Sequence, residues 1–325
     1  MNSKTLKLCL VVCTIVGLAH AQTEALRTQK IDTSYFVRIG GIDQYISLKG
    51  VKHHPIVLYL HGGPGAAASA HSDKITGSLE QDFLVIHWDQ RGAGNTLKTN
   101  GLTQPPTWAV MQSDADALLA YVLNTFHRKQ LILVANSWGT TLAFHLAETH
   151  PKQISTLVAI SPLVSLLSSQ KSQNKMLIKH YRKHKNRTAV KQLQSINIPY
   201  QGAGDMAIQF RWLSAYQGHP IKEDDFKSYL QFFEQWYTQW GVLYDELYKV
   251  NRLKKIPAWP CRTIIFSGDN DYTAYYKLTK KFFQRLKVKE KEIHWFNGIG
   301  HQIPRAASAK MKALLLKVLT DDGMN

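Results

Sequence analysis

Apolar runs of strand length alternate with helix-like segments along most of this chain, and this alternation limits the folds open to it. The strand-like runs are PIVLYL (55–60), DFLVIHW (82–88), LILVA (131–135), STLVAIS (155–161), RTIIFSG (262–268) and EIHWFN (292–297). Helical patterns lie near 107–127, 138–149, 273–287 and 302–319. Strands that alternate with helices predict an α/β fold with a mainly parallel sheet and helices on both faces.

Two segments depart from this alternation. YFVRIGGIDQYISL (35–48) predicts two antiparallel strands joined at Gly40-Gly41. From Pro162 to Pro257 the strand pattern stops, and the sequence becomes polar, basic and helix-like. We therefore predict a helical cap insertion at 162–257 within one sheet domain, which is built from 22–161 and 258–325.

The first 21 residues have the pattern of a secretory signal peptide. Lys4 and Lys7 precede an apolar run of about 12 residues, and Ala19-His20-Ala21 fits the small residues before a cleavage site. A bilayer-spanning helix needs about 20 apolar residues, so an anchor is disfavoured. We expect cleavage near Ala21 and export to the periplasm or the medium.

Only one cysteine follows the predicted signal peptide. Cys9 and Cys13 lie within the signal, and Cys261 precedes a strand-like run. A mature exported chain with a single cysteine has no internal disulfide. We expect Cys261 to be a buried and inert thiol.

The chain is strongly basic, with a net charge of +17, and removal of Lys4 and Lys7 leaves 17 − 2 = +15. Lysines recur every four residues at Lys171, Lys175, Lys179 and Lys183, which forms one basic helical face. A solvated surface is the favoured interpretation, and weak contact with an anionic surface is the alternative. No nucleic-acid-binding module is recognisable, so we expect no nucleic-acid partner. The oligomeric state is left open.

Functional side chains of an open parallel sheet collect at the carboxyl ends of its strands. LILVA ends in Asn136-Ser137-Trp138-Gly139, which resembles the G-x-S-x-G nucleophile elbow with Ala135 in place of the first glycine. The motif needs small residues because its strand and helix backbones lie close together. A serine that caps a helix would explain these five residues equally well.

The residues that follow two further strands favour Ser137 as a nucleophile rather than as a helix cap. Asp271 follows RTIIFSG, and His301 follows EIHWFN after a short glycine-containing turn. The order Ser137, Asp271, His301 is the order of the Ser-Asp-His triad in α/β-hydrolases. Asp269 lies on the same loop as Asp271 and stays an alternative.

A glycine-rich turn follows another strand. His61-Gly62-Gly63-Pro64-Gly65 can present backbone N–H groups that no side chain covers. Acyl transfer needs two such donors for the oxyanion, one from this type of loop and one from the residue after the nucleophile, here Trp138.

These motifs together resemble the proline iminopeptidase branch of the α/β-hydrolases. The resemblance rests on HGGPG (61–65), WDQRGAG (88–94), NSWGTTLAFHLAETHP (136–151) and the late G-x-x-D and GxGH stretches. It implies an eight-stranded sheet with a helical cap, oxyanion N–H groups from Gly63 and Trp138, and Asp271 as the residue that orients His301. It implies a serine hydrolase with an acyl-enzyme intermediate and neither a metal nor an organic cofactor.

The substrate is the least determined feature. The family holds the free amine of its substrate with cap glutamates, but the nearest match here, Trp212 to Gly218, carries Gln217 at that position. The expected substrate is a small peptide, with Trp212, Tyr216 and Gln217 as candidate binding residues. The alternative is a carboxylesterase for small or medium acyl esters, with Trp212, Tyr216 and Phe233 in an apolar pocket. A ligand-binding protein without catalysis is the third possibility.

Overall fold

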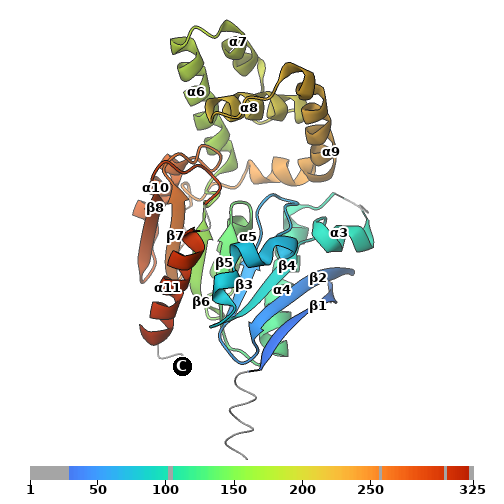
Figure 1. Cartoon of the computed structure of the whole chain (residues 1–325), viewed down its shortest axis with the longest axis vertical. Helices are drawn as coiled ribbons and strands as arrows, with labels where there is room; N and C mark the ends of the chain where they lie inside the picture. Colours follow the sequence, from blue (N-terminus) through green and yellow to red (C-terminus); the bar gives the residue numbers. More distant parts are fainter. Residues whose placement is uncertain (1–28, 102–104, 256–257, 304–305, 322–325) are drawn as a thin grey trace, which may run out of the picture.

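The computed structural model describes residues 29–101, 105–255, 258–303 and 306–321, so the predicted signal peptide lies outside the described residues. Its centre is an eight-stranded sheet (Figure 1) with the order β1-β2-β4-β3-β5-β6-β7-β8. The strands are β1 (Lys30–Ile39), β2 (Ile42–Val51), β3 (Ile56–Leu60), β4 (Leu84–Asp89), β5 (Leu131–Asn136), β6 (Ile154–Ile160), β7 (Arg262–Gly268) and β8 (Lys291–Phe296). The predicted mainly parallel α/β sheet is confirmed.

Helices occupy most of the connections between these strands. They are α2 (Ser72–Ile75), α3 (Gly94–Asn100), α4 (Trp108–Thr125), α5 (Gly139–Thr149), α6 (Leu166–Lys183), α7 (Arg187–Ser195), α8 (Ala203–Tyr216), α9 (Glu223–Leu247), α10 (Tyr276–Arg285) and α11 (Ala306–Asp321), with short 3₁₀ turns η1 (Ser69–His71) and η2 (Gly77–Leu79). Among the described residues, no helix has the length and apolarity needed to cross a membrane.

The sheet combines one antiparallel hairpin with a parallel core. β1 pairs antiparallel with β2, and Gly40 and Gly41 connect them with positive φ angles of 54° and 80°. That backbone geometry suits a tight hairpin turn and favours glycine. β2 also pairs antiparallel with β4, whereas the pairs from β4 to β8 are parallel. The parallel strands β3 and β4 are buried along their whole length, which explains their continuous apolar sequences.

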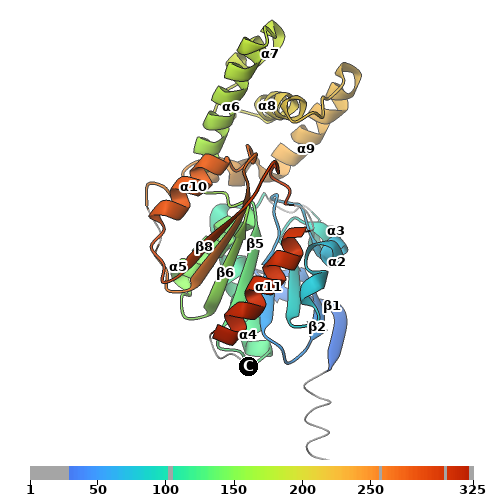
Figure 2. The ribbon, with the colours of Figure 1, turned by 60° about the vertical axis from the view of Figure 1, so that its left-hand side comes forward.

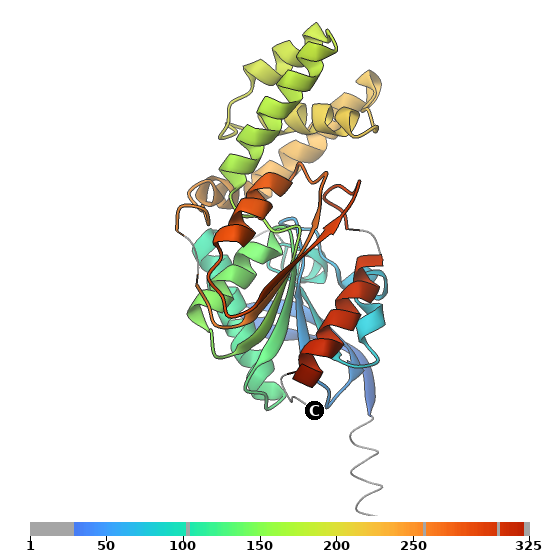
Figure 3. The ribbon, with the colours of Figure 1, turned by 90° about the vertical axis from the view of Figure 1, so that its left-hand side faces the viewer.

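Helices cover both faces of the sheet (Figure 3). Side chains of α4, α5 and α10 pack on one face in the larger apolar cluster, and side chains of η2 and α11 pack on the other. Cys261 is a buried free thiol, as expected, and burial raises its pKa to about 12. With both faces covered, the carboxyl ends of the parallel strands lie together at one edge of the sheet.

Four helices, α6 to α9, separate β6 from β7 and lie beyond that edge (Figure 2). They have apolar clusters of their own: one joins Leu177 and Tyr181 of α6 to Leu213 of α8. The basic face of α6 is exposed at Lys171 and Lys175 and onward along the helix. Contact of this basic face with an anionic surface stays a prediction. The boundaries of the cap insertion at 162 and 257 also stay predictions.

Two buried histidines are held uncharged beneath the carboxyl edge. The His61 ring donates from Nδ1 to the Gly62 carbonyl (2.7 Å) and accepts at Nε2 from the Gln90 N–H (3.2 Å). His87 Nε2 lies 2.7 Å from the Thr76 hydroxyl, and His87 Nδ1 has no partner in the described structure. Burial lowers the pKa of His61 to about 4 and that of His87 to about 3.

We expect the free energy of unfolding to fall as the pH drops below about 6.5, because the unfolded chain then protonates both imidazoles while the folded chain does not. The loss continues to about pH 4 for His61 and about pH 3 for His87. Each imidazole contributes about 1.4 kcal/mol per pH unit in its window. Urea unfolding of the wild type and of His87→Gln between pH 7.5 and 4.5 measures this. The variant should show a shallower pH dependence, and equal slopes would contradict the assignment for His87.

Candidate functional site

Ser137 lies at the sharp turn between β5 and α5. Its φ is +49°, a left-handed conformation that is uncommon for a residue with a side chain. The turn is held because the Ser137 N–H donates to the Ile160 carbonyl of the neighbouring strand (2.9 Å). A Cβ at Gly139 would lie 2.3 Å from the Leu60 carbonyl oxygen, so only glycine fits the start of α5. Ala135 is fully buried in β5, where it pairs with Leu60 of β3, so the fold has an alanine where the motif has its first glycine.

The structure brings Ser137, His301 and Asp271 into one hydrogen-bonded chain. The Ser137 hydroxyl lies 2.8 Å from His301 Nε2, and His301 Nδ1 lies 2.9 Å from Asp271 Oδ2. Ser137 is placed by β5, Asp271 by the loop after β7, and His301 by the loop after β8. The Ser161 hydroxyl donates to the His301 carbonyl (2.9 Å) and fastens that last loop to the end of β6.

The two aspartates of the β7–α10 loop have different partners. Asp271 is fully buried, and its Oδ1 accepts from the N–H groups of Thr273 (3.0 Å) and Ala274 (2.9 Å). Asp269 Oδ1 accepts from the Gly298 N–H (2.7 Å) and so braces the turn before His301. Of the two candidates, Asp271 is the carboxylate that hydrogen-bonds the His301 imidazole.

The glycine-rich loop lies against the nucleophile elbow. A Cβ at Gly62 would lie 3.3 Å from the Ser137 Cβ, and Gly63 lines the same cavity as Ser137. Gln90 ties the two segments together: its Oε1 accepts from the Trp138 indole N–H (2.8 Å), and its Nε2 donates to the His61 carbonyl (3.1 Å). Gln90 lies inside the WDQRGAG stretch, but no sequence pattern marks it as a residue that connects these two segments.

A cavity of about 1140 Å³ opens above Ser137 and His301. Its floor comes from the strand ends, and α6, α8 and α9 contribute walls. The wall residues from these helices are Leu166, Gln170, Gln173, Met206, Phe210, Phe232, Phe233, Gln235, Trp236, Gln239, Trp240 and Tyr244. No aspartate or glutamate lines the cavity among the described residues, and Lys74 is the lysine that does. The cavity therefore offers apolar and amide surface rather than negative charge.

The predicted substrate-binding residues Trp212, Tyr216 and Gln217 are not part of the lining of this cavity. Trp212 and Tyr216 pack in the apolar cluster of α6, α7 and α8, where the Trp212 indole N–H donates to Gln192 Oε1 (2.8 Å) and the Tyr216 hydroxyl donates to the Tyr272 hydroxyl (3.3 Å). The exposed Gln217 reaches toward Gly300, where an added Cβ would lie 3.4 Å from its amide nitrogen. None of the three lines the cavity. Of the residues proposed for the ester pocket, Phe233 does.

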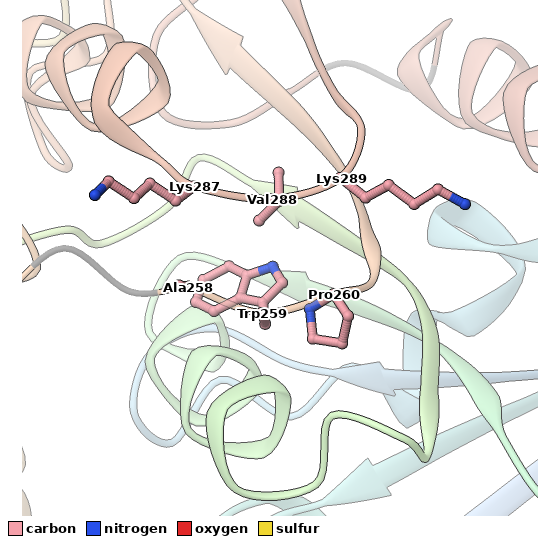
Figure 4. A pocket seen from close by; sticks show the side chains of 6 residues that line it. All are labelled: Ala258, Trp259, Pro260, Lys287, Val288 and Lys289. Carbon is pink, nitrogen blue, oxygen red and sulfur yellow. The ribbon is translucent and has the colours of Figure 1, made fainter.

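A second, smaller hollow of about 480 Å³ lies away from this site (Figure 4). Its lining comes from the segments before β7 and β8, namely Ala258, Trp259, Pro260, Lys287, Val288 and Lys289. The two lysine side chains extend in opposite directions along their segment rather than into the hollow. Among the described residues, no three His, Cys, Asp or Glu side chains converge as metal ligands.

Known proteins match this arrangement closely enough to assign a family. The serine aminopeptidase family S33 matches residues 51–305. The chain belongs to that family. It is 25% identical over 288 residues to "Probable aminopeptidase YbaC" of Bacillus subtilis. The aligned region covers 81% of this chain and 88% of that protein.

One further relative and one solved structure are also similar to this chain. A proline iminopeptidase of Xylella fastidiosa is 36% identical over 115 residues, which span 35% of this chain and 34% of that protein. The crystal structure of the proline iminopeptidase of Mycobacterium smegmatis superposes with a TM-score of 0.60 at 15% identity, covering 89% of this chain and 98% of that one. The chain is thus a serine hydrolase with the α/β-hydrolase fold, similar to the proline iminopeptidase branch.

Proposed function

We propose that this S33 hydrolase cleaves small acyl substrates through an acyl-enzyme on Ser137. The observation that carries the proposal is the hydrogen-bonded chain from Ser137 through His301 to the buried Asp271, at the floor of the large cavity. Such a chain makes a hydroxyl nucleophilic because the imidazole accepts its proton during attack.

The roles follow from the atoms that meet. His301 Nε2 takes the Ser137 proton as the hydroxyl oxygen attacks the acyl carbon, and it then donates that proton to the leaving amine or alcohol. Asp271 holds Nδ1–H toward itself, so that Nε2 faces the serine, and it stabilises the imidazolium. A water that His301 deprotonates then cleaves the acyl-enzyme.

The oxyanion of each tetrahedral intermediate needs backbone donors beside Ser137. We assign this role to the N–H groups of Trp138 and Gly63. Their support is the position of Trp138 at the start of α5, where helix N–H groups lack partners, and the packing of the glycine-rich loop on the elbow.

The first substrate class is a small peptide with a free amino terminus. Family membership and the similarity to the Bacillus subtilis protein support it. The basis for export is the amino-terminal pattern around Lys4, Lys7 and Ala21, which makes an extracellular or periplasmic peptide the expected substrate.

The second class is a carboxylic ester, and the lining of the cavity favours it. Phe210, Phe233 and Trp236 offer apolar surface, and no carboxylate lines the described cavity to pair with a substrate ammonium. An uncharged acyl group is accommodated there without loss of an ion pair.

Labelling of the nucleophile tests the enzyme class, and a comparison of substrates separates the two substrate classes. A fluorophosphonate probe should label the purified mature protein, and absence of labelling beside a known serine hydrolase would contradict the proposed nucleophile. Hydrolysis of prolyl and alanyl arylamides, free and N-blocked, is then compared with hydrolysis of aryl esters of increasing chain length. Faster cleavage of arylamides supports the peptidase, whereas cleavage of esters alone supports the esterase.

A further inference from the structure

The cap helix α9 contacts the glycine-rich loop beside Ser137. The indole N–H of Trp236 donates to the Pro64 carbonyl (3.3 Å). The indole of Trp240 packs so closely on Gly65 that a Cβ added to this glycine would lie 2.9 Å from the indole nitrogen. Trp240 is buried in the main apolar cluster, so the core fixes this contact. The two tryptophans therefore hold the second half of the HGGPG loop.

The same helix, which runs from the cap down to the carboxyl edge of the sheet (Figure 2), also contacts the loop after β4. Gln239 Nε2 donates to the Gly92 carbonyl (2.6 Å). Gln90 of that loop donates in turn to the His61 carbonyl (3.1 Å), at the start of HGGPG. Residues 236, 239 and 240 have the spacing of one helix face. One face of α9 therefore supports both loops that border the nucleophile.

The HGGPG loop has little conformational restraint of its own. Gly62, Gly63 and Gly65 have no Cβ, and the φ angles of the last two are positive, at 115° and 90°. Glycine adopts many backbone conformations at similar energy, so the observed conformation depends on what surrounds the loop. An oxyanion donor must lie about 2.7–3.1 Å from the oxygen that it stabilises. Contacts on both sides of Gly63 therefore set the direction of its N–H.

Building on the proposed acyl transfer at Ser137, we propose that Trp236 is a positioning residue of the oxyanion hole and that Gln239 supports it. The indole N–H of Trp236 fixes the Pro64 carbonyl, and this contact restrains the Gly63 N–H directly before it in the loop. The cap then takes part in transition-state stabilisation and is more than a wall of the cavity. Neither side chain transfers a proton or bonds to the acyl carbon.

The indole N–H of Trp236 can be removed while an aromatic ring is kept. The ring lines the cavity and packs edge-on against Tyr244, with 4.8 Å between the ring centroids. Phenylalanine keeps an aromatic ring at this position but has no N–H to donate. Trp236→Phe therefore removes the hydrogen bond to Pro64 and retains most of the apolar contact.

Two inhibitors of nearly the same shape measure the oxyanion hole directly. In an alkyl trifluoromethyl ketone, the Ser137 oxygen bonds to the carbonyl carbon, the serine proton passes to His301 Nε2, and the carbonyl oxygen becomes an oxyanion. The matching trifluoromethyl alcohol fills the cavity but forms no oxyanion. The ratio of the two inhibition constants therefore separates stabilisation of the oxyanion from binding to the cavity walls.

Trp236→Phe should weaken inhibition by the ketone about tenfold and leave inhibition by the alcohol unchanged. The activity should fall by a similar factor in kcat rather than through KM, because the oxyanion forms only after substrate binding. Gln239→Met has no donor for the Gly92 carbonyl and should change the ketone constant and kcat in the same direction. Trp212→Phe is the control, since the Trp212 indole N–H donates to Gln192 within the cap, away from the cavity. It should keep all three values.

Different outcomes contradict the positioning role and the proposed function. If folded Trp236→Phe and Gln239→Met both bind the ketone within about twofold of the wild type, or if ketone and alcohol weaken equally, the positioning role is wrong. The acyl-enzyme proposal survives either result when the wild type prefers the ketone and a fluorophosphonate labels Ser137. If the wild type shows neither the preference nor the label, the proposed function is wrong and the positioning role falls with it.

Discussion

Replacement of Ser137 by alanine is expected to lower kcat by on the order of 10⁴–10⁶-fold on every cleaved substrate. The hydroxyl that lies 2.8 Å from His301 Nε2 is the group that we propose as the nucleophile, and alanine has no hydroxyl to replace it. Steady-state hydrolysis and fluorophosphonate labelling measure the effect, and both signals should disappear. Substrate affinity should remain, because the cavity walls are unchanged.

A matched serine provides the control. Ser195 is exposed at the end of α7, and its hydroxyl donates to the Gln192 carbonyl within that helix. Ser195→Ala should keep both hydrolysis and labelling. If Ser137→Ala retained more than about 1% of the wild-type kcat with an unchanged melting temperature, another nucleophile would be required.

Replacement of Asp271 by asparagine should lower kcat by about 10⁴-fold. The asparagine has the same shape but no charge, so the imidazole loses the acceptor that keeps its proton on Nδ1, 2.9 Å from Asp271 Oδ2. The histidine then presents the wrong tautomer to Ser137. Single-turnover hydrolysis with an ester substrate measures the loss of acylation directly.

Asp269 is the matched control on the same loop. Its Oδ1 accepts from the Gly298 N–H, and an asparagine oxygen can accept the same bond. Asp269→Asn should therefore stay within a few-fold of the wild-type kcat. A large loss in Asp269→Asn with an active Asp271→Asn would reverse the assignment of the two carboxylates.

Strand positions were predictable because burial on both faces leaves a continuous apolar signature. RTIIFSG predicted 262–268, the bounds of β7, and the hairpin around Gly40-Gly41 was predicted from its turn, although β1 and β2 extend beyond 35–48. Helix starts were less predictable. The predicted helix 273–287 begins later, at Tyr276, because Asp271 Oδ1 captures the Thr273 and Ala274 N–H groups and holds that stretch as a loop.

The residues that line the cavity could not be predicted from the sequence. Trp212, Tyr216 and Gln217 were selected by spacing from a family motif, yet α8 turns the two aromatics into its own packing against α6 and α7. Gln170 and Gln173 line the cavity and carried no motif, since a glutamine in a polar helix is ordinary in sequence. Their place beside the cavity follows only from the packing of α6 over the sheet.

The amino-acid sequence by itself determined the α/β class, the order of Ser137, Asp271 and His301, and the turns that place each of them at a strand end. These are local properties: periodicity sets the elements, and small residues permit the elbow. The tertiary structure decided which aspartate holds the imidazole, which helix faces line the cavity and that no described carboxylate lies there. These depend on contacts between segments far apart in the chain, whose register follows from the packing of the whole core.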